Sequence, residues 1–184
     1  TVQNISDGIT LQQEIRKKGE DAYRPLGQKS VQQTNMQTVF PVQEIRLWEP
    51  ENPYLYEIRT SLWKNGEMID ARVDITGFRE AGFRKDGFYL NGKKLRLRGL
   101  NRHQSYPYVG YAAPASMQIF DADILKKELG VNAVRTSHYP QSQDFIRRCD
   151  EIGLLVFTEF PGWQHIGDEE WKRQAVQNLM EMIV

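Results

Sequence analysis

The chain has 184 residues, with 24 Lys and Arg balanced by 24 Asp and Glu. A formal net charge of zero gives no overall field that would draw it to nucleic acid or to an anionic membrane. Its apolar runs are far shorter than the roughly 20 residues that span a bilayer. Cys149 is the only cysteine, which excludes a disulfide within the chain and leaves the compartment undecided. We therefore expect a globular protein with no nucleic-acid and no membrane partner.

The first 82 residues alternate in the manner of short antiparallel strands. A strand is expected over residues 9–15, ending at Lys18-Gly19, followed by a polar stretch over residues 20–38 that predicts a loop with at most a short strand. Residues 38–47 alternate weakly, and the two prolines of residues 49–53 predict a turn. Beyond the turn, Asn65-Gly66 predicts a hairpin between strands over residues 54–63 and 68–79. Short strands with turns at this spacing predict a partial β-sandwich over residues 1–82.

From residue 83 the pattern changes to alternating strands and helices. A small hairpin, residues 88–90 against 94–97, precedes three expected strands over residues 95–100, 131–136 and 154–159. Three helices are expected with the N-caps Asp121, Ser142 and Asp168, and Gly130 and Gly153 are expected to end the first two. The first should bury Ile124, Leu125 and Leu129, the second Phe145, Ile146, Cys149 and Ile152, and the third should place Trp171, Ala175, Leu179 and Met182 on one stripe. Repeated strand–helix units predict a parallel sheet or barrel over residues 83–184.

Polar side chains follow each expected strand of this second half. Asn101-Arg102-His103 follows the first strand, Ser137-His138-Tyr139-Pro140 the second, and Glu159 ends the third. The carboxyl ends of barrel strands meet on one face, so we expect His103, His138 and Glu159 to share a pocket. Arg98 and Arg135, near the ends of the first two strands, need a carboxylate or ligand partner if they lie inside a barrel.

Each of these residues also has an ordinary structural interpretation. A single His at a strand end is more often a structural hydrogen-bonding group, but two at equivalent positions favour a functional role. Glu159 is expected either to pair with Arg135 or Arg98 or to act in the pocket, and the sequence favours neither. Trp163 is equally consistent with stacking on a sugar and with packing of its loop. We expect His165, in the same glycine-rich loop, to be merely solvated. No metal-ligand spacing, phosphate loop or nucleophile elbow is present.

Four segments resemble glycoside hydrolase family 2, the β-galactosidase and β-glucuronidase family. They are residues 47–56 (LWEPENPYLY), 73–79 (VDITGFR), 88–103 (FYLNGKKLRLRGLNRH) and 132–140 (NAVRTSHYP), in the family's order and at its spacing. The resemblance covers residues 45–160 and implies part of an immunoglobulin-like β-sandwich followed by the first three β/α units of a (β/α)8 TIM barrel. A complete barrel alone needs about 250 residues. We therefore expect this chain, which starts at Thr1 without a signal peptide, to be a piece of a longer protein.

The resemblance also implies an activity, a retaining hydrolysis of terminal β-linked sugars. The residues expected to bind substrate are His103, His138, Arg135, Asn101, Glu159 and Trp163. Such enzymes use two carboxylates about 5 Å apart, which in this family end the fourth and seventh strands, the first of them in an Asn-Glu pair. This chain contains no Asn-Glu pair. We therefore expect both catalytic carboxylates to lie outside it, Glu159 to match neither, and the chain alone to be inactive.

The substrate expectation is a β-galactoside. Glucuronidases of the family tend to have Lys in the middle of the motif that reads Asn101-Arg102-His103 here, so Arg102 favours a galactosidase. Gln104, which stands where an acidic residue is expected after the motif, counts against it. β-Glucuronidase or another family 2 specificity is the alternative, and a non-catalytic carbohydrate-binding or structural module is the alternative of a different class. Some galactosidases bind Mg²⁺ through a Glu and a His after the third strand, but Trp163 stands at the Glu position beside His165. We therefore predict no metal and no cofactor.

An open sheet of three parallel strands exposes unpaired edges and an apolar inner face. Such surfaces favour pairing with a second copy, so we expect a homo-oligomer. The alternative is that the last helix covers the sheet with Trp171, Leu179 and Met182.

Overall fold

The computed structural model describes residue 2 and residues 7–183. It divides into two compact units, each described here by itself. The first comprises Thr1–Trp48 and Tyr54–Arg79, and the second Glu49–Pro53 and Glu80–Val184. The chain thus leaves the first unit for five residues, enters the second and returns.

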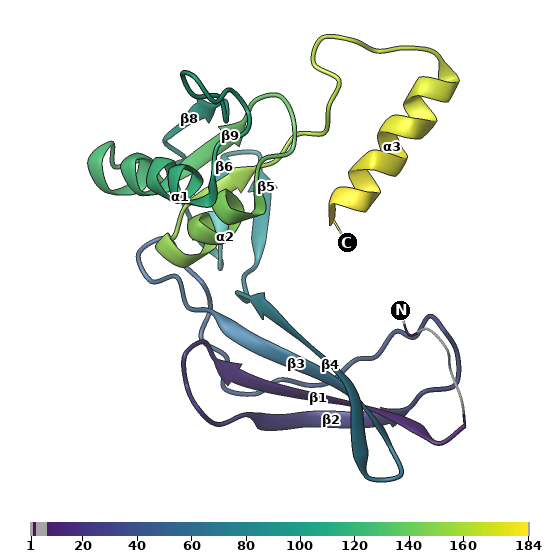
Figure 1. The fold of residues 1–184 in the computed structure, drawn as a ribbon. Coiled ribbons are helices and arrows are strands. Elements are labelled where there is room, and N and C mark those ends of the chain that lie inside the picture. The colour runs from purple at the N-terminus through teal and green to yellow at the C-terminus, as the bar shows by residue number, and fades with distance from the viewer. Residues whose placement is uncertain (1, 3–6, 184) are drawn as a thin grey trace. The chain divides into compact units, whose positions relative to one another are not determined.

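The first unit contains a four-stranded antiparallel sheet in the order β2-β1-β3-β4. The strands are β1 (Ile9–Lys17), β2 (Arg24–Ser30), β3 (Tyr56–Lys64) and β4 (Glu67–Thr76), and Figure 1 shows them side by side. The predicted Asn65-Gly66 hairpin joins β3 to β4, and both residues have positive φ, as a tight hairpin turn requires. Ile9, Leu11 and Val31 form a buried cluster against Met36, Phe40 and Leu62.

Residues 20–38, expected to form a loop with at most a short strand, contain the seven-residue strand β2. This strand pairs with β1 through a bulge at Gln13/Glu14 and is mostly exposed. It has a ladder partner on one side only, so its sequence needs no apolar alternation, and Pro25 is tolerated there. Residues 38–47, by contrast, form no strand. Within the described residues the unit therefore presents a single sheet.

The second unit begins with a small antiparallel sheet of β5 (Ala81–Arg84), β6 (Gly87–Leu90) and β7 (Lys93–Lys94). A parallel sheet follows in the order β10-β9-β8, made of β8 (Gly99–Arg102), β9 (Ala133–Thr136) and β10 (Leu155–Phe157). Its helices are α1 (Ala115–Asp123), which continues as the π-helix η1 (Ile124–Glu128), α2 (Gln143–Ile152) and α3 (Glu169–Ile183). The strand–helix alternation predicted from the sequence is present.

Helices α1 and α2 pack on the same face of the parallel sheet (Figure 1). The core between them consists of Ala122, Leu125, Val134, Phe145, Cys149 and Leu154. Helix α2 is capped as expected, because Ser142 Oγ accepts a hydrogen bond from the Asp144 amide and Gly153 adopts a left-handed conformation with φ 77°. Among the described residues no helix packs on the opposite face of the sheet in this way, and that face forms the pocket described below.

Three sequence expectations for the first strand–helix unit need correction. The helix begins at Ala115 rather than near Asp121, because Pro114 occupies the N-cap position and the Asp121 side chain binds Arg102 instead of capping. Leu129 is exposed rather than buried. The strand begins at Gly99 rather than Leu95, since Asn132 bonds Arg96 O and the Arg98 amide and holds that segment outside the ladder.

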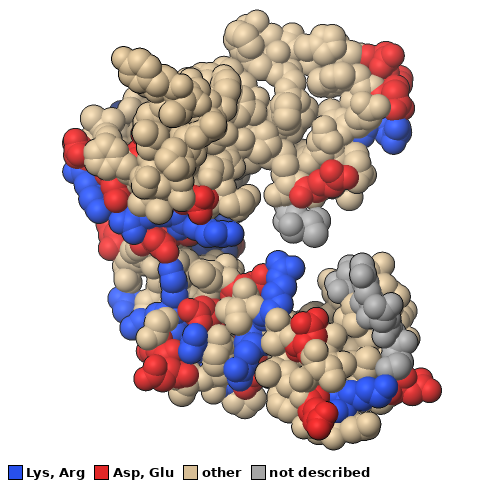
Figure 2. Space-filling view, in the orientation of Figure 1, with Lys and Arg blue, Asp and Glu red and all other residues tan. Residues whose placement is uncertain are grey.

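Helix α3 begins as predicted, with Asp168 Oδ1 accepting a hydrogen bond from the Trp171 amide at 2.9 Å. Trp171 packs on the preceding loop, next to Phe160, Gly162 and Gly167, while Leu179 is exposed. The structure therefore does not place these residues as a cover on the parallel sheet. Among the residues described, no helix is long and apolar enough to cross a membrane. On the face drawn in Figure 2, acidic and basic side chains are interspersed, which fits the zero net charge.

Candidate functional site

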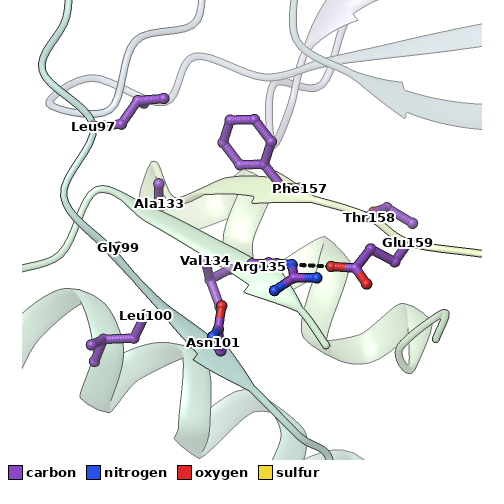
Figure 3. Close-up of a pocket in the computed structure, with 10 residues that line it drawn as sticks. All are labelled: Leu97, Gly99, Leu100, Asn101, Ala133, Val134, Arg135, Phe157, Thr158 and Glu159. Atoms are coloured by element: carbon purple, nitrogen blue, oxygen red, sulfur yellow. Dashed lines mark hydrogen bonds and ion pairs between the residues drawn. The ribbon is translucent and has the colours of Figure 1, made fainter. Parts of the chain in front are cut away.

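A depression of about 470 Å³ lies along the uncovered face and the carboxyl ends of β8, β9 and β10. Figure 3 shows that Arg135 and Glu159 extend toward each other across it and that Asn101 projects from β8. Apolar side chains make up much of the remaining wall. The lining residues are Leu97, Gly99, Leu100, Asn101, Ala133, Val134, Arg135, Phe157, Thr158 and Glu159.

Three polar side chains from two strand ends form a connected group. Arg135 Nε donates to Glu159 Oε1, and Glu159 Oε2 lies 3.2 Å from His138 Nδ1. Partial burial would raise the pKa of Glu159, but hydrogen bonds from Arg135 and His138 outweigh that effect and hold it below its usual value. Thr136 fixes the strand end as well, because its hydroxyl accepts from the Glu159 amide and donates to Phe157 O. Glu159 is therefore an ionised, positioned carboxylate at neutral pH.

This arrangement also orients the imidazole of His138. His138 Nδ1 lies between two charged groups, 3.2 Å from Glu159 Oε2 and 3.4 Å from Arg135 Nη2, so the ion pair holds one edge of the ring. The ring itself stacks on Trp163, with centroids 4.8 Å apart and planes 16° apart. Trp163 remains 60% exposed, so it packs on the site while still presenting aromatic surface.

The two strand-end histidines lie together. The ring centroids of His103 and His138 are 5.4 Å apart at 75°, and His103 also lies 6.0 Å from the Tyr139 ring. The structure thus brings His103, His138 and Glu159 to one edge of the sheet, as the strand-end argument predicts. The peptide bond between Ser137 and His138 is cis.

Other candidates lie elsewhere. His165 packs edge-on against Trp171, with centroids 5.5 Å apart, and so belongs to the loop before α3. Arg98 is exposed and precedes β8 instead of ending it, so the expectation that it lies near the strand's end was wrong. Glu159 pairs with Arg135, which settles the choice of its cationic partner. The described residues include no cluster of three or more His, Cys, Asp and Glu side chains suited to a metal ion.

The sequence reading missed Arg102, the buried cation of this strand end. Its side chain is 5% exposed and forms an ion pair with Asp121 of α1 at 2.7 Å. The available signal was alternation along β8, because Asn101 faces the pocket and its neighbour must face the helices. A cation pointing into a helical core requires a carboxylate, and Asp121 was the acid within reach.

Comparisons with known proteins agree with this architecture. The sequence model of glycosyl hydrolases family 2 matches residues 2–79, and that of the TIM barrel domain of the same family matches residues 82–182. A β-galactosidase of Thermoanaerobacterium thermosulfurigenes is 61% identical over 142 residues, which are 77% of this chain and 20% of that protein. A putative β-glucuronidase of Formosa agariphila is 41% identical over 140 residues, 75% of this chain and 17% of that protein.

Solved structures show the same fold. An FMN-binding β-glucuronidase from Facaelibacterium prausnitzii matches with a TM-score of 0.84 and 31% identity, over 97% of this chain and 27% of that one. A β-glucuronidase of Bacteroides uniformis matches with a TM-score of 0.80 and 33% identity, over 95% of this chain and 22% of that one. The chain spans about a fifth of the length of the curated relatives that it matches most strongly. A sandwich domain followed by the start of a TIM barrel, matched over nearly all of its residues, makes this chain a member of glycosyl hydrolase family 2.

Proposed function

We propose that this chain supplies the sugar-contacting edge of a retaining β-glycosidase, with a terminal β-galactoside as the substrate. The observation that carries the proposal is the convergence of His103, His138, Arg135 and Glu159 at the carboxyl ends of three parallel strands, the face on which barrel enzymes bind substrate. In this proposal, His138 Nε2 contacts a sugar hydroxyl, and Asn101 and Trp163 line the same space.

Galactoside is favoured over glucuronide on two grounds. The relatives at 61% and 58% identity are named β-galactosidases, whereas the glucuronidases among the relatives and structures have lower identity. A glucuronide also carries a carboxylate that needs a cation, and the one guanidinium lining the pocket, Arg135, is already paired with Glu159. A neutral hexose makes no such demand.

The chain alone should lack activity. Retaining hydrolysis needs an acid/base and a nucleophile about 5 Å apart, and Glu159 is the single carboxylate in the lining of the pocket. With Glu159 engaged by Arg135 and His138, neither role is filled. Purified chain should therefore leave nitrophenyl β-galactoside and β-glucuronide uncleaved, and sustained turnover above a buffer blank would refute this part of the proposal.

The positive test uses the longer protein that contains this segment. It should hydrolyse nitrophenyl β-galactoside with a higher kcat/KM than the glucuronide, and the reverse order would overturn the substrate assignment. His138→Ala should lower kcat/KM by about 2- to 13-fold, the value of a hydrogen bond to a neutral hydroxyl, mostly through kcat. His165→Ala is the matched control and should keep parental kinetics. If the longer protein binds galactosides without cleaving them, the non-catalytic module is the correct alternative.

A further inference from the structure

We infer that Arg102 and Gln104, the two neighbours of His103, form a clamp that sets the distance between the imidazoles of His103 and His138. The inference deepens the proposed function, because the catalytic meaning of that distance rests on both rings contacting the sugar. Both residues act as positioning residues through His103 and touch no substrate themselves.

The first arm of the clamp is the guanidinium of Arg102. Nε and Nη2 bind Asp121 Oδ2 at 2.9 and 2.7 Å, and Nη2 also donates to Gln118 Oε1 at 2.7 Å. Nη1 donates to Gln141 Oε1, and the cation lies 4.0 Å from the centre of the Phe145 ring. Gln141 follows His138 by three residues in the same loop, so one buried side chain ties the end of β8 to the segment that carries the second histidine.

The second arm is Gln104. Its Oε1 accepts a hydrogen bond from the Ser142 amide at 2.8 Å, at the residue that caps α2. The residues before and after His103 thus bind consecutive positions, Gln141 and Ser142, of the other loop. His103 itself is exposed, so the contacts of its neighbours, more than packing around its own ring, fix where its backbone lies.

The chemistry of the first arm requires arginine. A guanidinium presents its donors in a rigid planar fork, and here that fork meets three acceptor side chains at once. Lysine would keep the positive charge for Asp121 but, as a flexible point charge, would not hold Gln141 and Gln118 in the same plane. The second arm needs only an acceptor, which a carboxylate also supplies.

The protein offers a matched control for loss of helix packing. Arg148 of α2 binds Asp123 of α1 at 2.8 Å and Glu151 of its own helix at 3.1 Å, so its pair with Asp123 joins the two helices. None of these three residues belongs to a segment that carries His103 or His138. Arg148→Lys should therefore perturb helix packing while leaving the distance between the rings unchanged.

The test is nuclear magnetic resonance of the 184-residue chain with 13C-labelled histidine. The chain has three histidines, so the ring signals are few and are assigned with single His→Gln variants. We expect a cross-relaxation peak between the rings of His103 and His138 in the parent chain, loss of that peak in Arg102→Lys and Gln104→Leu, and its retention in Gln104→Glu and Arg148→Lys. Should Arg102→Lys not fold, the contrast of Gln104→Leu with Gln104→Glu decides alone.

The inference is overturned if the peak persists in folded Gln104→Leu, or if Arg148→Lys abolishes it as well. These outcomes are separable from the fate of the proposed function. Ring proximity is read without any substrate, so an inactive longer protein would refute the glycosidase proposal while leaving the clamp intact. Conversely, a cross-peak that persists in folded Gln104→Leu, together with galactoside hydrolysis by the longer protein, would refute the clamp alone.

Discussion

At the residue scale, Glu159 combines an ion pair with a place in the wall of the pocket. One oxygen is held by Arg135, and the other faces His138. The sequence left pairing and pocket function as alternatives, whereas the geometry combines them. The pair fixes the carboxylate, and the fixed carboxylate contacts the imidazole of His138.

The lowered pKa of Glu159 predicts a dependence of stability on acid pH. A carboxylate with a depressed folded-state pKa stabilises the fold above the ordinary Glu value of about 4.3, and this contribution disappears as the pH falls through the folded value. The unfolding free energy of the parent, from urea titrations at a series of pH values, should therefore fall more steeply below about pH 4.3 than that of Glu159→Gln. Glu128→Gln, a change on the exposed end of the π-helix, should retain the parental slope. Parallel curves for Glu159→Gln and the parent would contradict the prediction.

Cys149 gives a second residue-scale prediction, at alkaline pH. Its thiol is fully buried in the core, and burial raises the pKa to about 12. The unfolded thiol ionises near pH 8.5, so the folded state should lose relative stability as the pH rises from about 8.5 toward that value. At pH 8 a disulfide reagent should leave the folded chain unmodified and titrate one thiol after addition of denaturant. Rapid labelling of the native chain would show that the core opens.

The residues of the candidate site were predictable because strand-end position follows from chain order. His103, His138 and Glu159 each follow an apolar strand, and parallel strands must end on the same edge. Arg102 was not recognised because assigning it to the buried side required the true start of β8. That start depends on hydrogen bonds from Asn132, some 30 residues away, which no local pattern records.

At the element scale, the two glycines that end helices form a natural pair. Gly130 and Gly153 both have positive φ, at 65° and 77°. A Cβ at Gly130 would meet nothing within 4 Å, whereas one at Gly153 would lie 2.1 Å from the carbonyl oxygen of Pro50. The glycine signal in the sequence is the same at both sites, so only the tertiary contact separates them.

Alanine at these two positions should therefore have unequal cost. Gly130→Ala should lose about 1 kcal/mol, the penalty for a side chain in the left-handed region. Gly153→Ala adds a backbone collision and should lose roughly 3 kcal/mol or more, because overpacking is added to the same penalty. Chemical denaturation of both variants measures the difference. Equal losses would mean that the segment from Glu49 to Pro53 yields without resistance.

Element boundaries were harder to predict than element types. The second helix was read correctly because Ser142 and Gly153 give local capping signals that the structure uses. The first helix begins seven residues earlier than expected, with Pro114 instead of Asp121 at its N-cap, because the Asp121 side chain binds Arg102. Strand β2 was expected only as a possible short strand without defined bounds, because a mostly exposed edge strand carries no apolar period.

At the scale of the whole molecule, the second unit leaves apolar surface uncovered. Phe83, Leu100 and Phe157 are 72%, 47% and 38% exposed, and in the described sheet β8 and β10 have a ladder partner on one side only. Bare strand edges beside apolar surface favour association. This chain by itself is therefore predicted to form homo-oligomers, most simply a two-fold dimer.

Light scattering at micromolar concentration measures the mass directly. We expect a dimer mass for the parent and a shift toward monomer for the double variant Phe83→Asp and Leu100→Lys, which places charge on the uncovered surface. Val176→Lys, on the exposed side of α3, is the control and should leave the mass unchanged. A monomer mass for a parent chain with a folded circular-dichroism spectrum would reject the prediction.

The excursion of residues 49–53 into the second unit also sets an order of events during synthesis. Besides the exposed ion pair of Glu49 with Lys93 at 3.2 Å, Pro50 O accepts from Lys126 Nζ at 3.0 Å, and Lys126 also binds Gly153 O at 2.8 Å, so the contacts of the Pro50 carbonyl lie 76 and 103 residues downstream. At about 5–20 residues per second, the ribosome needs about 4–15 s to reach Lys126 after it has made Pro50. The strands on either side of the loop are complete long before that. The contact of Pro50 with Lys126 and Gly153 therefore forms late, only after the C-terminal end of α2 has been synthesised, while the strands of the first unit are already complete.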